Sequence, residues 1–193
     1  FIGLEMAENL HHRGIKVTIV EMAQQVMNVV DYDIAAEVHQ HLKTKNVEFY
    51  LKDGVSSFAR ANDRITLTLK SGKKIDADLV ILSIGVRPDA RLAKEAGLET
   101  GTTGGIRVNE FLQTSDPDIY AVGDAVEFPS PITGKPTITY LAGPANRQGR
   151  IAADNIVYGN KIKYPGAIAT AVAKVFDLRS EEHTSELQSR QSI

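Results

Sequence analysis

The sequence has 193 residues, 42% of them hydrophobic, and its 22 Lys and Arg nearly balance 24 Asp and Glu, for a formal net charge of -2. This charge balance argues against a nucleic-acid-binding surface or a basic membrane-binding surface, and the apolar content suffices for the core of one or two ordinary domains. The sequence contains no cysteine, which excludes disulfides, cysteine-ligated metal sites and thiol chemistry carried by these residues. No apolar run is long enough to span a membrane, so we expect a cytoplasmic protein without nucleic-acid or membrane partners.

Helix and strand patterns alternate at the start of the chain. Residues 3–13 place apolar side chains at helical spacing and are followed by Gly14, which predicts a short amphipathic helix. Residues 15–21 are rich in β-branched side chains and end on the acid Glu21, which indicates a buried strand. A second amphipathic helix is predicted over residues 31–45, with His39 and His41 on different faces.

Strand patterns dominate the next segment. Short strands within residues 47–51, 54–60 and 64–69 predict an antiparallel meander closed by the turn at Ser71. Residues 79–84 are almost continuously apolar, as expected of a central parallel strand leading to a glycine.

In the second half of the chain, the predicted strands are separated by longer loops. Residues 106–108 predict a strand, and residues 118–122 predict a buried strand that ends at a Gly-Asp turn. Residues 144–158 predict a helix, whose inner face would contain Ile151, Ala152, Asn155 and Ile156.

Both ends of the sequence are unusual. The chain begins at Phe1 rather than Met and enters a helix without a preceding strand, so we expect a truncated start. Residues 166–178 read as a glycine followed by a β-rich apolar stretch, whereas residues 179–193 are polar and aperiodic. The string RSEEHTSELQS resembles the translation of a common sequencing adapter, so we expect residues 179–193 to be a non-native tail without function.

Gly3 and Glu21 have the spacing of the second half of a dinucleotide-binding fingerprint. In that fingerprint, glycines let the backbone approach a pyrophosphate at a helix N-terminus, and an acid about 20 residues later binds the adenine ribose hydroxyls. An ordinary helix–strand pair with an exposed terminal Glu gives the same pattern. If the site exists, Glu21 favours NADH over NADPH, because residues 22–25 offer no Lys or Arg for a 2'-phosphate.

A second motif, TSDPDIYAVGD, covers residues 114–124. Gly123 would permit close approach of a ligand, and Asp124 would present a carboxylate beyond the end of a strand, where α/β sheets bind ligands. The alternative is a strand followed by a routine turn.

These motifs resemble the pyridine nucleotide-disulfide oxidoreductase family of flavoproteins. Eight positions match its second FAD signature: Thr114, Ser115, Pro117, Ile119, Tyr120, Ala121, Gly123 and Asp124. FIGLE at 1–5, LSIGVRPD at 82–89 and LAGPANRQGR at 141–150 resemble its other nucleotide-binding segments. The last of these, together with AVAKVFDL at 171–178, is most similar to the coenzyme A-disulfide reductase and NADH oxidase branch.

The resemblance implies an α/β fold with two Rossmann-like domains, both incomplete, and the first strand of a C-terminal interface domain. Residues 1–88 would belong to the NAD-binding domain, 89–164 to the C-terminal half of the FAD-binding domain, and 165–178 to the dimerisation domain. The implied activity is hydride transfer from NADH, or less favourably NADPH, to FAD and on to a disulfide, polysulfide or oxygen, in a homodimer.

The resemblance also implies roles for individual residues. Asp124 would accept a hydrogen bond from the FAD ribityl chain, Gly123 would let the backbone approach the pyrophosphate, and the backbone at Leu141 and Ala142 would stabilise negative charge on the reduced flavin. The residues expected to hold NADH are Ile2, Gly3, Glu21 and Gly85, with Glu5 near the nicotinamide. The family's redox cysteine lies in a segment that this sequence lacks, so we expect no catalytic residue and no metal site here, and an inactive fragment.

Two alternatives stay open. The protein could be a flavoprotein without a redox cysteine that passes electrons to an iron-sulfur partner, or a module that binds NADH without turnover. Arg147 and Arg150, one turn apart, and Arg87 beside a turn are equally compatible with a solvated surface.

Overall fold

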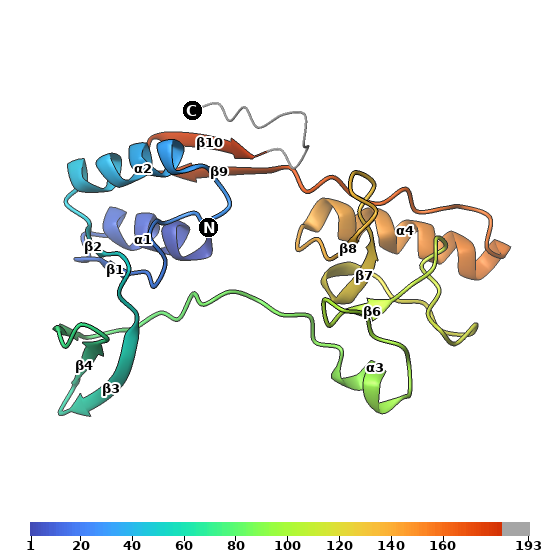
Figure 1. Ribbon diagram of the computed structural model, residues 1–193, viewed down its shortest axis with the longest axis horizontal. Helices are drawn as coiled ribbons and strands as arrows, with labels where there is room; N and C mark the ends of the chain where they lie inside the picture. The colour runs from blue at the N-terminus through green and yellow to red at the C-terminus, as the bar shows by residue number, and fades with distance from the viewer. Residues whose placement is uncertain (183–193) are drawn as a thin grey trace. The chain divides into compact units, whose positions relative to one another are not determined.

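The computed structural model describes residues 1–182, which form two compact units (Figure 1). The first unit comprises Phe1–Ile84 and Thr170–Glu182, and the second comprises Gly85–Ala169. The division after Ile84 lies near the domain boundary expected after residue 88, whereas the segment expected to start a further domain contributes to both units. The assignment of these segments to the domains of a whole protein stays a prediction.

A β-α-β arrangement forms the centre of the first unit. β1 (Thr18–Val20) and β2 (Glu48–Tyr50) pair in parallel, and α2 (Tyr32–Thr44) connects them, as parallel strands require. Helix α1 (Ile2–His12) precedes β1, and a positive φ at Gly14 follows its end, as predicted. The core of this unit is formed by buried apolar side chains of α1, of α2 and its flanking segments, and of residues 173–176, namely Leu4, Val26, Met27, Val30, Ala35, Val38, Leu42, Val47, Ala173, Val175 and Phe176.

The antiparallel meander consists of β3 (Val55–Ala61), β4 (Arg64–Leu69) and β5 (Lys74–Ala77), in that order. A three-stranded antiparallel meander was predicted and is found, but its three strands are not all the ones that were predicted. Residues 47–51 belong instead to the parallel pair, because α2 returns the chain alongside β1. The missed strand β5 is short and half polar, which weakens its alternation signal.

Residues 79–84 form no strand, contrary to the prediction of a central parallel strand. The side chains of Leu79 and Ile84 are 67% and 87% exposed. A strand needs a neighbour that accepts and donates ladder hydrogen bonds, and none of the strands in residues 1–182 pairs with this segment.

A hairpin near the end of the described chain belongs to the first unit. β9 (Ala171–Val175) pairs antiparallel with β10 (Leu178–Glu182), and the pair contacts α1 and α2 (Figure 1). The β-rich stretch predicted before residue 178 is confirmed, whereas the prediction that residues 179–182 lack regular structure is wrong. The rest of the expected tail, residues 183–193, lies outside the described residues.

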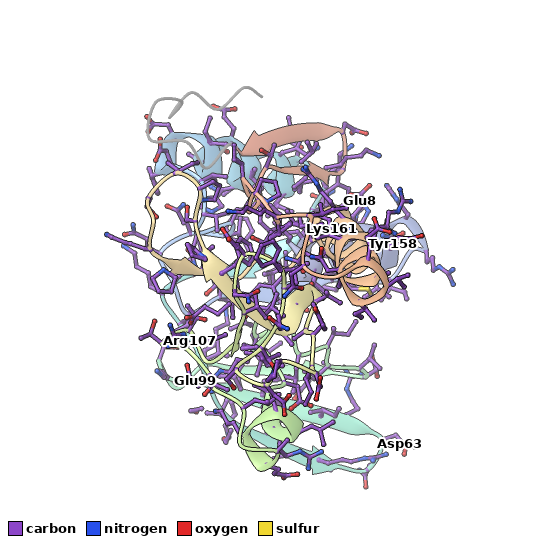
Figure 2. All side chains as sticks on the ribbon, turned by 90° about the vertical axis from the view of Figure 1, so that its right-hand side faces the viewer. Glu8, Asp63, Glu99, Arg107, Tyr158 and Lys161 are labelled. Atoms are coloured by element: carbon purple, nitrogen blue, oxygen red, sulfur yellow. The ribbon has the colours of Figure 1, made fainter. Side chains whose placement is uncertain are left out.

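The second unit is built around one long helix. α4 (Ala142–Tyr158) packs against β7 (Val126–Pro129). The unit also contains α3 (Arg91–Glu95) and the short strands β6 (Ile106–Arg107) and β8 (Pro136–Thr137). β6 and β7 are parallel, and β7 and β8 antiparallel. Figure 2 shows Arg107 beside Glu99, where their side chains form an ion pair at 3.1 Å.

The predicted buried strand over residues 118–122 is wrong in most of its length. Only Tyr120 forms a bridge, with Gln113, and Ile119 and Val122 are exposed. As with residues 79–84, no described strand provides a full ladder. Among residues 1–182, no helix combines the length and apolar character that crossing a membrane requires.

Candidate cofactor-binding sites

The predicted site residues fall into both units. Ile2, Gly3, Glu5 and Glu21 lie in the first unit, and Gly123, Asp124, Leu141 and Ala142 lie in the second. Gly85 begins the second unit with a φ of 91°, a conformation that favours glycine, and a Cβ added there would meet nothing within 4 Å. Each group is therefore described separately.

Gly3 lies in the first turn of α1, where the helix approaches residues 79–84 closely. A Cβ at Gly3 would lie 3.3 Å from Cβ of Ser83, tighter than an ordinary contact. This is the role that the last glycine of a dinucleotide fingerprint has in helix–strand packing. Ile2 and the first-turn acid Glu5 are exposed, and no side-chain cap binds the first turn of α1. Its free N–H groups suit an anion such as a phosphate.

Glu21 follows β1 directly, at the carboxyl end of the parallel pair. Its backbone continues the pairing with β2, since its N–H donates to the Tyr50 carbonyl at 2.9 Å and its carbonyl accepts from Asp53. One carboxylate oxygen accepts from the Ala23 N–H at 2.8 Å. The side chain is thereby oriented, and its other oxygen is available for a ribose hydroxyl.

Residues near Glu21 add a cation that sequence reasoning missed. The Lys70 ammonium lies 3.8 Å from the Met22 sulfur, and both side chains approach Gly54. Residues 22–25 contain no Lys or Arg, but the meander places Lys70 beside Met22, where it could pair with a 2'-phosphate.

Gly123 and Asp124 form a turn that packs on α4. They belong to the single 3-10 turn η1 (Gly123–Ala125), and Gly123 has a φ of 84°. A Cβ there would meet only Ala145 at 3.9 Å, an ordinary contact, so glycine is needed for its conformation rather than for space. Asp124 is exposed, as a ligand-binding carboxylate would be.

The N-terminus of α4 has free N–H groups beside this turn. Leu141 is the N-cap, with no side-chain capping bond, and Ala142 starts the helix. Leu141 is half-buried and Ala142 exposed. Uncapped N–H groups and the helix dipole favour negative charge at this end, so the backbone here fits the anionic edge of a reduced flavin.

Gln148 joins the turn to the helix, and sequence reasoning missed it. Its Oε1 accepts a hydrogen bond from the Gly123 N–H at 2.6 Å, and its side chain is 1% exposed. The buried face of α4 contains Gln148, Ile151, Ala152 and Asn155. Ile156, predicted on this face, is instead 61% exposed. The i, i+3, i+4, i+7 spacing of residues 148, 151, 152 and 155 was the available signal.

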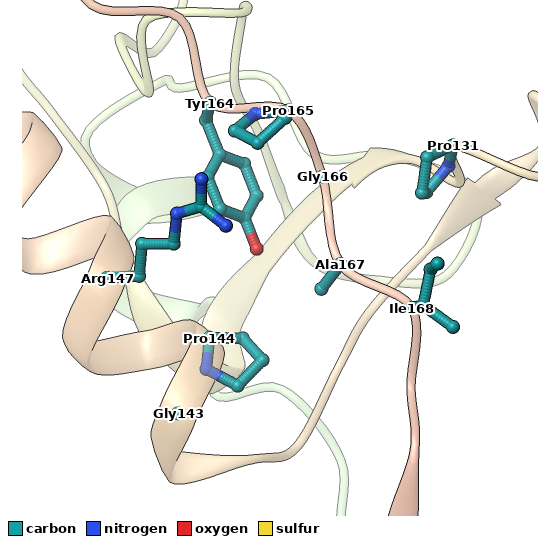
Figure 3. A pocket seen from close by; sticks show the side chains of 9 residues that line it. All are labelled: Pro131, Gly143, Pro144, Arg147, Tyr164, Pro165, Gly166, Ala167 and Ile168. Atoms are coloured by element: carbon teal, nitrogen blue, oxygen red, sulfur yellow. The ribbon is translucent and has the colours of Figure 1, made fainter. Parts of the chain in front are cut away.

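Arg147 and Arg150 are both exposed. Arg147 lines an open pocket of about 440 Å³ between the first turns of α4 and residues 164–168 (Figure 3). The buried Tyr164 hydroxyl makes no hydrogen bond of normal geometry there. Burial raises the pKa of this hydroxyl, and the nearby Gln148 amide and Arg147 guanidinium partly offset the rise. Within residues 1–182, no cluster of three potential metal ligands occurs.

The chain is similar to several known oxidoreductases. An NADH oxidase of Methanocaldococcus jannaschii is 40% identical over 178 residues, covering 92% of this chain and 39% of the relative. A CoA-dependent NAD(P)H sulfur oxidoreductase of Pyrococcus furiosus is 35% identical over 179 residues, covering 92% and 40%. The crystal structure of reduced CoADR-RHD from Bacillus anthracis superposes with a TM-score of 0.90 at 50% identity, covering 96% of this chain and 33% of that one.

The chain thus spans about two fifths of the length of these curated relatives. Its similarity to the solved structure identifies the fold as that of the FAD/NAD-binding, Rossmann-like oxidoreductases. The family described as pyridine nucleotide-disulphide oxidoreductase matches residues 1–149. The chain therefore belongs to the pyridine nucleotide-disulphide oxidoreductase family.

Proposed function

We propose that this chain is part of an FAD-dependent oxidoreductase that transfers hydride from NAD(P)H to FAD and on to a disulfide, polysulfide or oxygen. The observation that carries the proposal is the Gly123–Asp124 turn held against the uncapped N-terminus of α4, in a chain of this family. Relatives named NADH oxidase and NAD(P)H sulfur oxidoreductase support the choice of acceptors.

The second unit would bind FAD. The exposed Asp124 carboxylate would accept a hydrogen bond from a ribityl hydroxyl, and the backbone at Gly123 would lie along the pyrophosphate. The N–H groups at Leu141 and Ala142 would donate to the flavin edge that becomes negative on reduction. When bound, FAD would supply the hydride chemistry, and the chain would supply orientation and electrostatics.

The first unit would bind the nicotinamide cofactor. Glu21 would bind the adenine ribose with its free carboxylate oxygen, and the first turn of α1, with Ile2 and Gly3, would receive the pyrophosphate. Glu5 and Gly85 would line the path toward the nicotinamide. Glu21 favours NADH, and Lys70 would make NADPH tolerable.

The sequence itself favours keeping a second candidate. It contains no cysteine, so no residue of this chain can form a mixed disulfide with a substrate. If the remainder of the protein lacks one as well, the flavin would pass electrons to an iron-sulfur partner instead.

The experiment is to purify the complete protein encoded by the gene that carries residues 1–178. We expect bound FAD and steady-state oxidation of NADH with oxygen, coenzyme A disulfide or polysulfide. Turnover with a ferredoxin alone would favour the second candidate. Binding of NADH without turnover by any acceptor would leave only a nucleotide-binding module.

A matched pair of variants tests the site. Asp124→Ala should lower the flavin content of the purified protein, whereas Asp118→Ala, an exposed acid in the same segment, should not. A complete protein that purifies without flavin and does not bind added FAD would contradict the proposal. A homodimer and a cytoplasmic location stay predictions.

A further inference from the structure

Gln148 is a fully buried amide whose carbonyl oxygen is committed to one backbone donor. The Gly123 N–H donates to its Oε1 at 2.6 Å, and the side chain is 1% exposed. Buried polar side chains are almost always hydrogen-bonded, because an unpaired one costs about 1–3 kcal/mol. Since the partner is a donor, the oxygen must face Gly123, and the NH₂ group faces elsewhere.

The turn that donates this hydrogen bond, η1, lies against α4. η1 is a single turn between the extended residues Val122 and Val126, and its own closing bond is Val126 N–H to the Gly123 carbonyl. A Cβ added at Gly123 would meet the Cβ of Ala145, also on α4, at 3.9 Å. Gln148 therefore supplies the hydrogen bond that joins the turn to α4.

The same helix presents the other predicted flavin contacts. Its first turn lacks a side-chain cap, so the N–H groups at Leu141 and Ala142 are free for a ligand. Gln148 lies less than two turns further along α4 and is rigidly fixed relative to that end. One buried side chain thus links the carboxylate-bearing turn to the helix N-terminus.

We propose that Gln148 is a positioning residue that fixes the Gly123–Asp124 turn relative to the N-terminus of α4 and thereby sets the affinity of the site for reduced flavin. The inference rests on the proposed function for its flavin consequence and on the structure alone for its geometric consequence. Gln148 does not touch the cofactor; it acts through Gly123.

Three variants separate this role from general stability. Gln148→Met has a similar size and lacks the acceptor, whereas Gln148→Glu keeps an acceptor for the Gly123 N–H. Asn155→Leu is the control, because Asn155 is an equally buried amide two turns along α4 that bonds Phe111, Lys161 and Ile162 instead.

The first measurement is hydrogen exchange of a peptide covering residues 119–126 in the complete protein freed of flavin. We expect about tenfold faster exchange at Gly123 in Gln148→Met, near-normal exchange in Gln148→Glu, and no change in Asn155→Leu beyond its effect on global unfolding. Unchanged exchange in Gln148→Met overturns the proposal. If Gln148→Met does not fold, Gln148→Glu provides the test. Exchange at Gly123 in Gln148→Glu as fast as in an unstructured peptide would then overturn the proposal.

The second measurement is the midpoint potential of the flavin in the holoenzyme. Loss of a positioned turn should weaken binding of the reduced form about tenfold more than that of the oxidised form, which lowers a two-electron potential by about 30 mV. Gln148→Glu should keep the turn, and Asn155→Leu should leave the potential unchanged. An equal shift in Asn155→Leu overturns the positioning role. A complete protein that binds no flavin overturns the proposed function, and the exchange of Gly123 then decides the geometric claim alone.

Discussion

The carboxylate of Glu8 in α1 accepts a hydrogen bond from the backbone N–H of Phe176 at 2.9 Å. Glu8 is buried, and the Lys174 ammonium lies 3.5 Å from its other oxygen. The bond joins the first helix to the turn of the β9–β10 hairpin, with the Phe176 ring in the same core. A carboxylate buried in this way satisfies a backbone donor that the turn cannot satisfy itself.

Replacing Glu8 should therefore destabilise the first unit. Glu8→Leu leaves the Phe176 N–H without an acceptor and should lower the free energy of unfolding by about 1–3 kcal/mol. Glu8→Gln retains an acceptor and should cost less. Urea unfolding measures both changes, with the exposed Glu5→Gln on the same helix as a control expected within about 0.5 kcal/mol of the parent. Equal losses in Glu8→Leu and Glu5→Gln would show that the hairpin does not depend on this contact.

The stability of the first unit should fall as the pH falls below neutrality, through His39. Burial, and to a lesser degree Lys43, lowers the pKa of His39 from 6.5. The neutral ring accepts a hydrogen bond from the Val26 N–H at 3.2 Å. Between 6.5 and the lowered folded pKa, the unfolded chain binds the proton and the folded chain does not, so stability is present above this window and is lost as the pH falls through it.

The check is urea unfolding at a pH of about 7.5 and about 5.5 for the parent and for His39→Gln. We expect a smaller loss between the two pH values in His39→Gln, because Gln does not titrate. His12→Gln, at an exposed position of α1, should keep the loss of the parent. The same pH dependence in all three proteins would assign the effect to other groups.

The sequence predicted the elements of the β-α-β arrangement of the first unit, but it missed β5 and β10, although their partner strands β4 and β9 are present in the described chain. The strand before Glu21, the helix after Asp31 and the strand after Asn46 complete one β-α-β unit, and all three are found. Residues 79–84 and 118–122 carry equally apolar patterns but lack described neighbours, so they form no continuous strand. An apolar pattern shows that a segment is suited to a strand, but a strand forms only where a neighbouring strand provides the hydrogen-bond partners.

Side-chain contacts across long sequence distances could not be predicted. His39 and His41 were expected on different faces of α2, and they do differ: His39 bonds Val26, whereas His41 accepts from the Asp177 N–H. The sequence gives the angle between them but not these partners. Gln148 was missed for the same reason, because its role depends on its hydrogen bond with the Gly123 N–H, 25 residues away in the sequence.

Lys70 should influence the choice between the two nicotinamide cofactors. Its ammonium lies beside Met22, the residue after Glu21, where a 2'-phosphate would approach. In the complete enzyme, Lys70→Met should raise the KM for NADPH about tenfold, or about 1.4 kcal/mol, and leave the KM for NADH nearly unchanged. Glu21→Ser should raise the KM for NADH by a similar factor.

Steady-state kinetics with both cofactors check this, and Lys74→Met on the neighbouring strand is the matched control. The effect of Lys70 should shrink at high salt, because an exposed charge pair is screened. Equal changes for NADH and NADPH in Lys70→Met would place its role outside cofactor selection.

Two glycines of the second unit should respond oppositely to the same substitution. Gly123 has a φ of 84°, so Gly123→Ala forces a left-handed conformation that costs about 1–2 kcal/mol. The added methyl itself would meet Ala145 at an ordinary 3.9 Å, so the loss comes from backbone strain rather than from a clash. Gly149 lies inside α4 with nothing within 4 Å of an added Cβ, and Gly149→Ala should stabilise the helix by about 0.5–1 kcal/mol. Urea unfolding measures both changes, and the flavin content of the complete protein should fall only in Gly123→Ala. Stabilisation by both substitutions would mean that the turn does not need a residue in the left-handed conformation at position 123.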